Sequence, residues 1–179
     1  RRMVGVNKIL APLLGRPLVA HSVQAFQDSP EVDVIVLVMA PRQVDAGRHL
    51  ARQYGWDKVV DVSAGGDRRQ DSVRRGMEAL GDTEWTVVHD GARPCIDGDT
   101  LVRGLPEASK SGAAVAAIPV KDTIKAVGAN MVVTGTPARD ELWAVQTPQI
   151  FRTGLLEQAH REVAEDVTDD ATMVERTGR

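Results

Sequence analysis

The sequence contains a single cysteine, Cys95, among its 179 residues. One thiol excludes an internal disulfide, and it excludes a metal site built from clustered cysteines. A lone cysteine is typical of proteins in a reducing compartment, so we expect the protein in the cytoplasm.

Long hydrophobic runs are also missing. The longest apolar stretch, residues 34–40, has the length of one buried strand and is too short to cross a bilayer. The basic start, RRMVGVNK, is not followed by the apolar segment of a signal peptide. We therefore expect no association with a membrane.

Neither sign of charge dominates the chain. It has 22 Lys and Arg against 25 Asp and Glu, a net charge of −3. This balance indicates binding neither to nucleic acid nor to an anionic membrane. We interpret the pairs Arg68-Arg69 and Arg74-Arg75 as solvated helix faces rather than binding patches.

The sequence does contain a regular alternation of strands and helices. Short Val-rich segments, apolar on both faces, predict buried parallel strands at residues 32–40, 58–63, 85–90 and 112–120. Apolar residues at helical spacing predict helices at residues 17–29 and 67–81. This order predicts an α/β fold with a doubly wound, mostly parallel sheet.

Residues 124–137 interrupt the alternation. Two short β-like runs flank Gly128-Ala129-Asn130, which predicts a hairpin or arm that projects from the sheet. A strand at residues 143–151 and a helix at residues 154–166 should follow. Because the chain opens at Arg1 without Met and stops abruptly, we interpret residues 1–179 as one domain truncated at both ends.

Ligands of open α/β sheets bind at the carboxyl ends of the strands, so the residues that follow each strand are informative. After residues 58–63, Gly65 and Gly66 permit close backbone approach, Asp67 can cap the next helix, and Ser72 lies about one turn into it. Either a nucleotide-contacting loop or an ordinary strand-to-helix turn explains this segment, and local chemistry favours the turn.

The segment WTVVHDGARPC, residues 85–95, ends an apolar run on a carboxylate. Asp90 is suited to hold Mg²⁺, and Arg93 is suited to clamp a phosphate. Asp-Gly is also a strong turn signal, so local chemistry leaves a metal site and a plain turn about level.

Other strand ends carry weaker signals. Thr123 offers a hydroxyl between two lysines, where an exposed turn is the favoured alternative, and Thr147 offers another. Asp169 and Asp170 are interpreted as helix caps. Three histidines without partners at metal-ligand spacing are interpreted as structural: His21, His49 and His160. Glycine, hydroxyl, carboxylate and basic groups at successive strand ends suit phosphoryl or nucleotidyl transfer.

In their order along the chain, these segments resemble the 2-C-methyl-D-erythritol 4-phosphate cytidylyltransferase family. The combination of HDGARP, DTIK and QTPQ.F is specific, whereas any one of them alone is not. The matching segments are RRM…NK (1–8), GGDRRQDSV (65–73), VHDGARP (88–94), PVKDTIK (119–125), TPARDELWAVQTPQIF (136–151) and TDDATMVE (168–175).

The resemblance implies a Rossmann-like nucleotidyltransferase. Such enzymes transfer a cytidylyl group from CTP to 2-C-methyl-D-erythritol 4-phosphate and release pyrophosphate, with Mg²⁺ on the triphosphate. The implied site has Arg2 and Lys8 at the transition-state charge, Asp90 on Mg²⁺, and substrate-binding residues Gly66, Asp67, Ser72, Gly91, Arg93 and Thr147.

On the acceptor side, Arg139 and Thr123 match positions that hold the methylerythritol phosphate. The arm that carries them, about residues 124–142, reaches into the neighbouring subunit in that family, so the resemblance implies a homodimer with shared sites.

The chain departs from the family's pattern in several places, and other functions stay open. The family's first strand and its AAGxGxR loop precede the Arg-Met pair, and segments that follow ERTG in the family are absent. We therefore expect residues 1–179 alone to be inactive and unstable, and the intact parent to be active. The alternatives are a ribitol 5-phosphate cytidylyltransferase, a sugar-nucleotide synthetase of the same fold that uses another base, and a non-catalytic nucleotide-binding homologue.

Overall fold

The computed structural model describes residues 8–178. They form an α/β fold, as the alternation of apolar patterns predicts. The elements are η1 (Lys8–Leu10), β1 (Pro12–Leu13), β2 (Arg16–Pro17), α1 (Leu18–Gln27), β3 (Ile35–Met39), η2 (Pro41–Gln43), α2 (Val44–Tyr54), β4 (Val59–Ala64), α3 (Arg69–Leu80), β5 (Trp85–Val88), α4 (Asp99–Ser111), β6 (Ala113–Pro119), β7 (Ala126–Val127), β8 (Val133–Gly135), η3 (Arg139–Glu141), β9 (Trp143–Arg152), α5 (Thr153–Glu162) and α6 (Asp170–Glu175).

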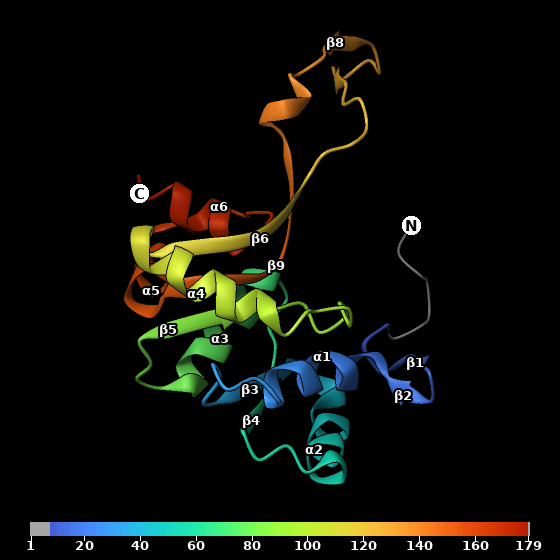
Figure 1. Ribbon diagram of the computed structural model, residues 1–179, viewed down its shortest axis with the longest axis vertical. Coiled ribbons are helices and arrows are strands. Elements are labelled where there is room, and N and C mark those ends of the chain that lie inside the picture. Colours follow the sequence, from blue (N-terminus) through green and yellow to red (C-terminus); the bar gives the residue numbers. More distant parts are fainter. Residues whose placement is uncertain (1–7, 179) are drawn as a thin grey trace.

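The amino-terminal part is built on the parallel pair β3 and β4, with α1 and α2 packed beside it (Figure 1). Its core joins Val19 of α1, Leu37 and Met39 of β3, and Leu50 of α2. The helix α2 lies close to the strands because Gly47 faces them: a Cβ there would lie 2.4 Å from Met39 Sδ. A larger residue at this position would push the helix off the sheet.

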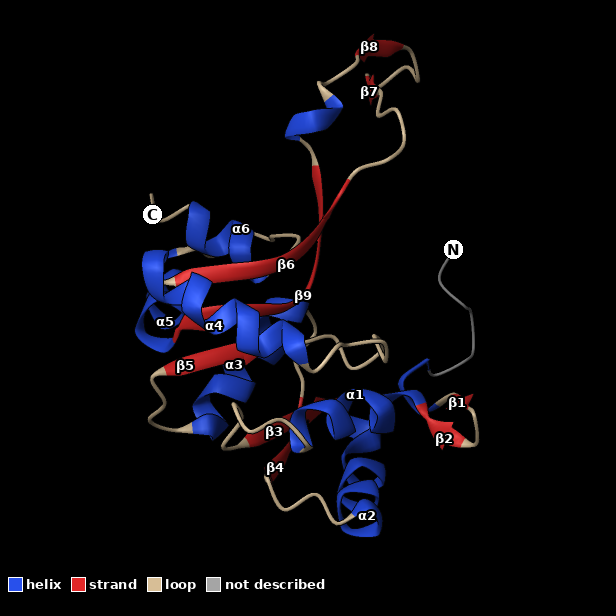
Figure 2. Ribbon diagram, in the orientation of Figure 1, coloured by secondary structure: helices blue, strands red, loops and turns tan. Residues whose placement is uncertain are grey.

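The carboxyl-terminal part is the three-stranded sheet β5-β9-β6 (Figure 2). Successive side chains of a strand point to opposite faces, and β9 uses both. Ile150 packs with Leu101 of α4 on one face. Phe151 packs with Leu156 of α5 and Met173 of α6 on the other.

The strand directions differ from the expected single, mostly parallel sheet. The strand β9 runs antiparallel to both β5 and β6. The chain leaves β6, makes the 120–142 excursion and returns directly beside β6, and a strand that returns without a crossover must run antiparallel. A cavity of about 1040 Å³ separates β3 from β5, and within residues 8–178 no strand pairing joins them.

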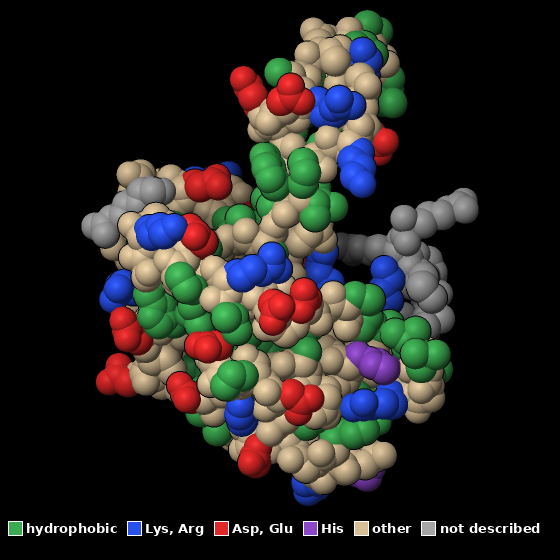
Figure 3. All heavy atoms as spheres, in the orientation of Figure 1, with side chains coloured by type: hydrophobic (Ala, Val, Ile, Leu, Met, Phe, Trp, Pro, Cys, Tyr) green, Lys and Arg blue, Asp and Glu red, His purple; other side chains and the backbone are tan. Residues whose placement is uncertain are grey.

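The excursion between β6 and β9 extends away from the body (Figures 1 and 3). Within it β7 pairs with β8 in antiparallel register, Ala126 opposite Gly135. The turn between them is closed by the Gly128 N–H, which donates to Val132 O at 2.9 Å. Of the helices in the described part of the chain, none combines the length and the apolarity needed to span a membrane.

Candidate active site

The carboxylate of Asp90 is the centre of the polar groups at the carboxyl end of β5. Arg93 Nε donates to Asp90 Oδ2 at 2.9 Å, and Arg69 Nε lies 3.5 Å from Asp90 Oδ1. Each carboxylate oxygen therefore faces a different guanidinium. The Asp90 side chain is still 38% exposed, so a ligand can reach it.

Asp90 also opens a turn, because the Arg93 N–H donates to Asp90 O at 2.9 Å. The choice between a turn and a ligand-binding carboxylate is therefore not exclusive: the backbone forms the turn while the side chain stays accessible. The Arg93 guanidinium extends the network by donating from Nη1 to Gln146 Oε1 on β9.

A chain of hydrogen bonds fixes this turn to β9. The Asp90 N–H donates to Thr147 Oγ1 at 3.2 Å, and Thr147 Oγ1 lies 3.1 Å from His89 Nδ1. His89 Nε2 is 3.0 Å from Arg93 O, a carbonyl that can only accept. The consistent assignment is a neutral His89 that carries its proton on Nε2 and accepts the Thr147 hydroxyl proton at Nδ1.

The environment of His89 supports the neutral form. Burial lowers the pKa of His89 below its ordinary value, although its hydrogen bond to Arg93 O acts in the opposite direction. No role was predicted for this histidine from the sequence, although it is the first residue of the HDGARP motif. The available signal was its place between an apolar strand and the Asp-Gly turn, where a ring with two nitrogens can hold both ends of a loop.

The glycine loop after β4 is shaped by Ser72. Its Oγ accepts the Gly66 N–H at 3.1 Å and donates to Arg68 O at 3.2 Å. Gly65 and Gly66 are both required sterically, because a Cβ would lie 2.7 Å from Ser72 Oγ at the first and 2.4 Å from Asp71 Cβ at the second.

The expected cap of α3 was wrong. Asp67 is exposed, and the residue at the N-cap position is Arg68. The carboxylate that serves the helix start is Asp71, which accepts the Arg68 N–H at 3.2 Å. Hydrogen bonds from the Arg68 side chain lower the pKa of Asp71 to about 2. Asp67 is thus left unused by the helix.

Gly91 lies against α1 rather than in an unusual backbone conformation. Its carbonyl accepts the hydroxyl proton of buried Ser22 at 3.1 Å, and a Cβ at Gly91 would lie 3.5 Å from Val19, an ordinary contact. The wall that Gly91 contributes to the site is therefore fixed by α1.

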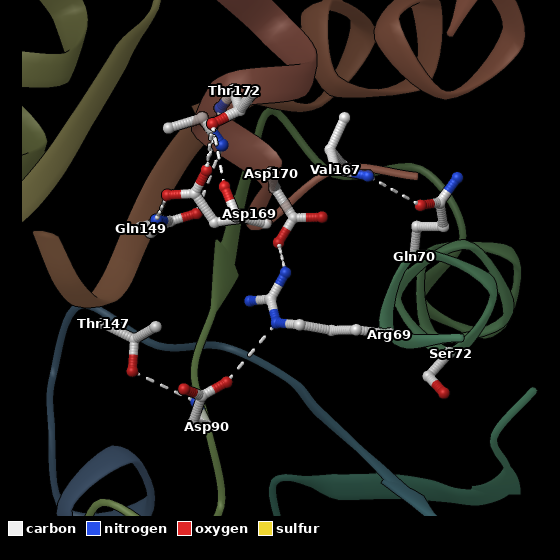
Figure 4. A network of polar contacts seen from close by, with 12 residues as sticks. Arg69, Gln70, Ser72, Asp90, Thr147, Gln149, Val167, Asp169, Asp170 and Thr172 are labelled. Carbon is white, nitrogen blue, oxygen red and sulfur yellow. Dashed lines mark hydrogen bonds and ion pairs between the residues drawn. The ribbon is translucent and has the colours of Figure 1, made fainter. Parts of the chain in front are cut away.

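Arg69 and Asp170 are residues of this site that the sequence patterns did not indicate. Arg69 reaches from the first turn of α3 between Asp90 and Asp170, and pairs with both (Figure 4). Arg69 is therefore not part of a solvated helix face. Asp169 does cap α6, since its Oδ1 accepts the Thr172 N–H at 3.0 Å, but Asp170 is buried and points to Arg69.

Among the described residues, no hydrogen bond or ion pair joins Lys8, Thr123 or Arg139 to Asp90. Arg2 lies outside the described residues. Lys8 is exposed at the start of η1. Thr123 and Arg139 are exposed on the excursion, where Arg139 Nη1 donates to Lys121 O at 3.1 Å.

The side chains at this site fit a Mg²⁺ ion that takes most of its ligands from a bound phosphate compound and from water. Residues 8–178 contain no group of three or more His, Cys, Asp or Glu side chains arranged to hold a metal, so no protein cage is formed there. One accessible carboxylate, Asp90, is what a magnesium ion needs when phosphate oxygens and waters supply its other ligands.

Comparison with known proteins confirms the resemblance that the motifs carry. The profile of the 2-C-methyl-D-erythritol 4-phosphate cytidylyltransferase family matches residues 1–179. A protein of that name from Dehalococcoides mccartyi strain CBDB1 is 45% identical over 176 residues, which cover 98% of this chain and 78% of the relative.

Solved structures agree with this match. A 4-diphosphocytidyl-2C-methyl-D-erythritol synthase from Anaerococcus prevotii superposes with a TM-score of 0.88 at 27% identity, covering 98% of this chain and 78% of its own. The Thermus thermophilus 2-C-methyl-D-erythritol 4-phosphate cytidylyltransferase gives 0.75 at 31% identity, covering 96% and 79%. The chain belongs to the 2-C-methyl-D-erythritol 4-phosphate cytidylyltransferase family.

Proposed function

We propose that the intact protein transfers the cytidylyl group of CTP to 2-C-methyl-D-erythritol 4-phosphate and releases pyrophosphate. A phosphate oxygen of the acceptor bonds to the α-phosphorus of CTP, and the bond from that phosphorus to the oxygen bridging to the β-phosphate breaks. The observation that carries the proposal is the place of Asp90, between two guanidinium groups at the end of β5, in a chain that matches this family throughout. Such chemistry needs mainly positioning and charge neutralisation.

The glycine loop is the proposed nucleotide side of the site. The Gly66 N–H is held by Ser72 Oγ, so the loop has its shape before a nucleotide arrives. Gly66 and exposed Asp67 are then free to face the cytidine, and Ser72 contributes by keeping the loop in place. A preformed loop avoids the entropy cost of ordering it on binding.

Asp90 is the proposed Mg²⁺ ligand. When bound, the ion neutralises charge on the triphosphate and on the departing pyrophosphate. Arg93 orients the Asp90 carboxylate, Thr147 fixes its backbone, and Gly91 forms the neighbouring wall. Arg2 and Lys8 are proposed to add positive charge beside the leaving group.

The excursion is proposed to hold the acceptor in a neighbouring subunit of a homodimer, through Thr123 and Arg139. Its surface supports this, because large apolar side chains are exposed on it: Met131 is 84%, Val132 56% and Val133 54% exposed. Apolar groups clustered in this way mark a surface that another protein covers.

The free, exposed thiol of Cys95 supports a reducing, cytoplasmic setting.

Pyrophosphate release tests the proposed reaction. The intact enzyme should release pyrophosphate from CTP with methylerythritol phosphate, and much less with ribitol 5-phosphate, since the family match favours the first acceptor. Faster release with ribitol 5-phosphate would reassign the acceptor. Nucleotide binding without release with either acceptor would indicate the non-catalytic alternative.

A further inference from the structure

Arg69 joins two carboxylates that come from distant parts of the chain. Its Nε lies 3.5 Å from Asp90 Oδ1, and its Nη1 donates to Asp170 Oδ2. In Figure 4 the guanidinium lies between the two acidic side chains, with its stem coming from α3. The Arg69 side chain is 34% exposed, so the cation remains accessible to an anion in the site.

Asp170 is a fixed anchor rather than a second ligand. Its side chain is 1% exposed, and a buried carboxylate is stable only when it is paired. His160 Nε2 is 3.5 Å from Asp170 Oδ1, and neither atom makes a hydrogen bond, so the direct partner of the carboxylate is Arg69. Removing Asp170 would release Arg69 from its position.

The start of α6 holds Asp170 rigidly against the sheet. Buried Gln149 of β9 donates from Nε2 to Asp169 Oδ2 at 2.7 Å and accepts the Ala171 N–H at 3.3 Å. These bonds hold the residues on both sides of Asp170. The guanidinium of Arg69 is thus placed by β9 through α6, independently of any ligand.

The two guanidiniums beside Asp90 oppose the binding of a bare cation. A divalent ion at Asp90 would meet Arg69 and Arg93 a few ångströms away, where like charges repel with an energy of several kcal/mol at most. Triphosphate brings negative charge that offsets both guanidiniums. The same Arg69 that repels free Mg²⁺ therefore favours Mg²⁺ that comes with a nucleotide.

We propose that Arg69, held in position by Asp170, restricts metal binding at Asp90 to a cation accompanied by a nucleoside triphosphate. The inference rests on the proposed function and adds an order of binding to it. In it Asp170 is a positioning residue that acts through Arg69. Without Arg69, Asp90 becomes a ligand for the free cation and the triphosphate loses an attractive charge.

Binding of Mn²⁺, measured by electron paramagnetic resonance with and without CTP, tests this. The wild type should bind free Mn²⁺ weakly and bind it much more tightly with CTP. Arg69→Gln should bind free Mn²⁺ roughly tenfold more tightly and Mn²⁺ with CTP roughly tenfold more weakly, as for the loss of one charge interaction. Arg69→Lys should restore most of the wild-type behaviour.

Two controls separate this role from a structural one. Arg74→Gln removes the same charge from the same helix but at a residue that pairs with Asp71, so it should leave Mn²⁺ binding unchanged. Asp170→Asn should shift Mn²⁺ binding in the same direction as Arg69→Gln, and the double variant should add little to Arg69→Gln alone.

Equal free-Mn²⁺ affinities for Arg69→Gln and Arg74→Gln would overturn the inference, as would additive effects of Arg69 and Asp170. These outcomes are distinct from failure of the proposed function. When only the inference fails, the wild type still releases pyrophosphate from CTP; when the proposed function fails, it does not.

Discussion

The hydroxyl of Thr147 on β9 accepts the backbone N–H of Asp90 at 3.2 Å, across 57 positions of sequence. The pairing of β5 with β9, Val88 opposite Gln149, brings the two residues together. The residue that we assign to Mg²⁺ is thus aligned by a strand that runs antiparallel to its own.

Replacing Thr147 with Val should loosen this alignment. Asp90 N loses its acceptor and His89 Nδ1 loses its donor, both in partly buried hydrogen bonds, at a cost of about 1 kcal/mol in the free energy of unfolding. Denaturant unfolding measures that cost, and CTP turnover should fall in parallel. Thr147→Ser keeps the hydroxyl and should keep both the stability and the turnover of the wild type. A Thr147→Ser variant as destabilised and as slow as Thr147→Val would show that the hydroxyl does not align Asp90.

His89 should give the fold a specific dependence on pH. Burial lowers its pKa in the folded state, so the unfolded chain takes up a proton near the ordinary value of 6.5 while the folded chain does not. The stability that neutral His89 contributes is fully present above that value and is lost as the pH falls through the folded pKa.

The measurement is the free energy of unfolding between about pH 7.5 and pH 5. It should decline less steeply with falling pH in His89→Gln than in the wild type. Exposed His49 provides the control, because His49→Gln should follow the wild-type curve. Parallel curves of unfolding free energy against pH for all three proteins would show that burial does not keep His89 neutral in the folded state.

Gly66→Ala should weaken nucleotide binding. The added methyl would lie 2.4 Å from Asp71 Cβ, a carbon fixed to the first turn of α3, so the loop must move away from the helix. We expect the Kd for CTP, measured by calorimetry, to rise on the order of tenfold, or about 1.4 kcal/mol. Gly154→Ala meets no atom within 4 Å and should leave the Kd unchanged. An unchanged Kd in Gly66→Ala would remove the loop from the nucleotide site.

Val133→Glu tests the excursion as a dimer contact. A charge among exposed apolar side chains should shift the sedimentation equilibrium toward monomer, because burying an unpaired carboxylate in an interface is costly. Val60 on β4 is similarly exposed, 58% against 54%, and lies off the excursion, so Val60→Glu should remain dimeric. A wild type that sediments as a monomer would refute the shared site.

Local patterns in the sequence predicted the strands of the core and the helices α1, α3 and α5, whereas α2 and α4 were not predicted. The Val-rich segments became β3, β4, β5 and β6 within a few residues, because burial on both faces leaves a clear signal. The direction of β9 was not predictable from its apolar pattern, since hydrophobic alternation reports which side chains are buried and not how a strand pairs.

The site was predictable only in part for a related reason. Asp90 and the glycine loop follow strands, so the topology of an α/β fold brings them to one end. The pairing of Arg69 with Asp170 spans 101 positions and depends on how α6 docks on β9, which no local pattern encodes. Asp169 and Asp170 look alike in sequence, yet the first is a helix cap and the second is buried.

The most direct measurement is Mg²⁺-dependent release of pyrophosphate from CTP and methylerythritol phosphate by the wild type, Asp90→Asn and Asp45→Asn. Asparagine keeps the shape of Asp90 but removes the charge that binds the ion, and Asp45 is an exposed helix residue, 97% accessible and remote in sequence from the site. We expect wild-type rates for Asp45→Asn and a loss on the order of a hundredfold or more for Asp90→Asn. Unchanged Mg²⁺-dependent activity in Asp90→Asn would contradict the proposed role of Asp90 as the Mg²⁺ ligand.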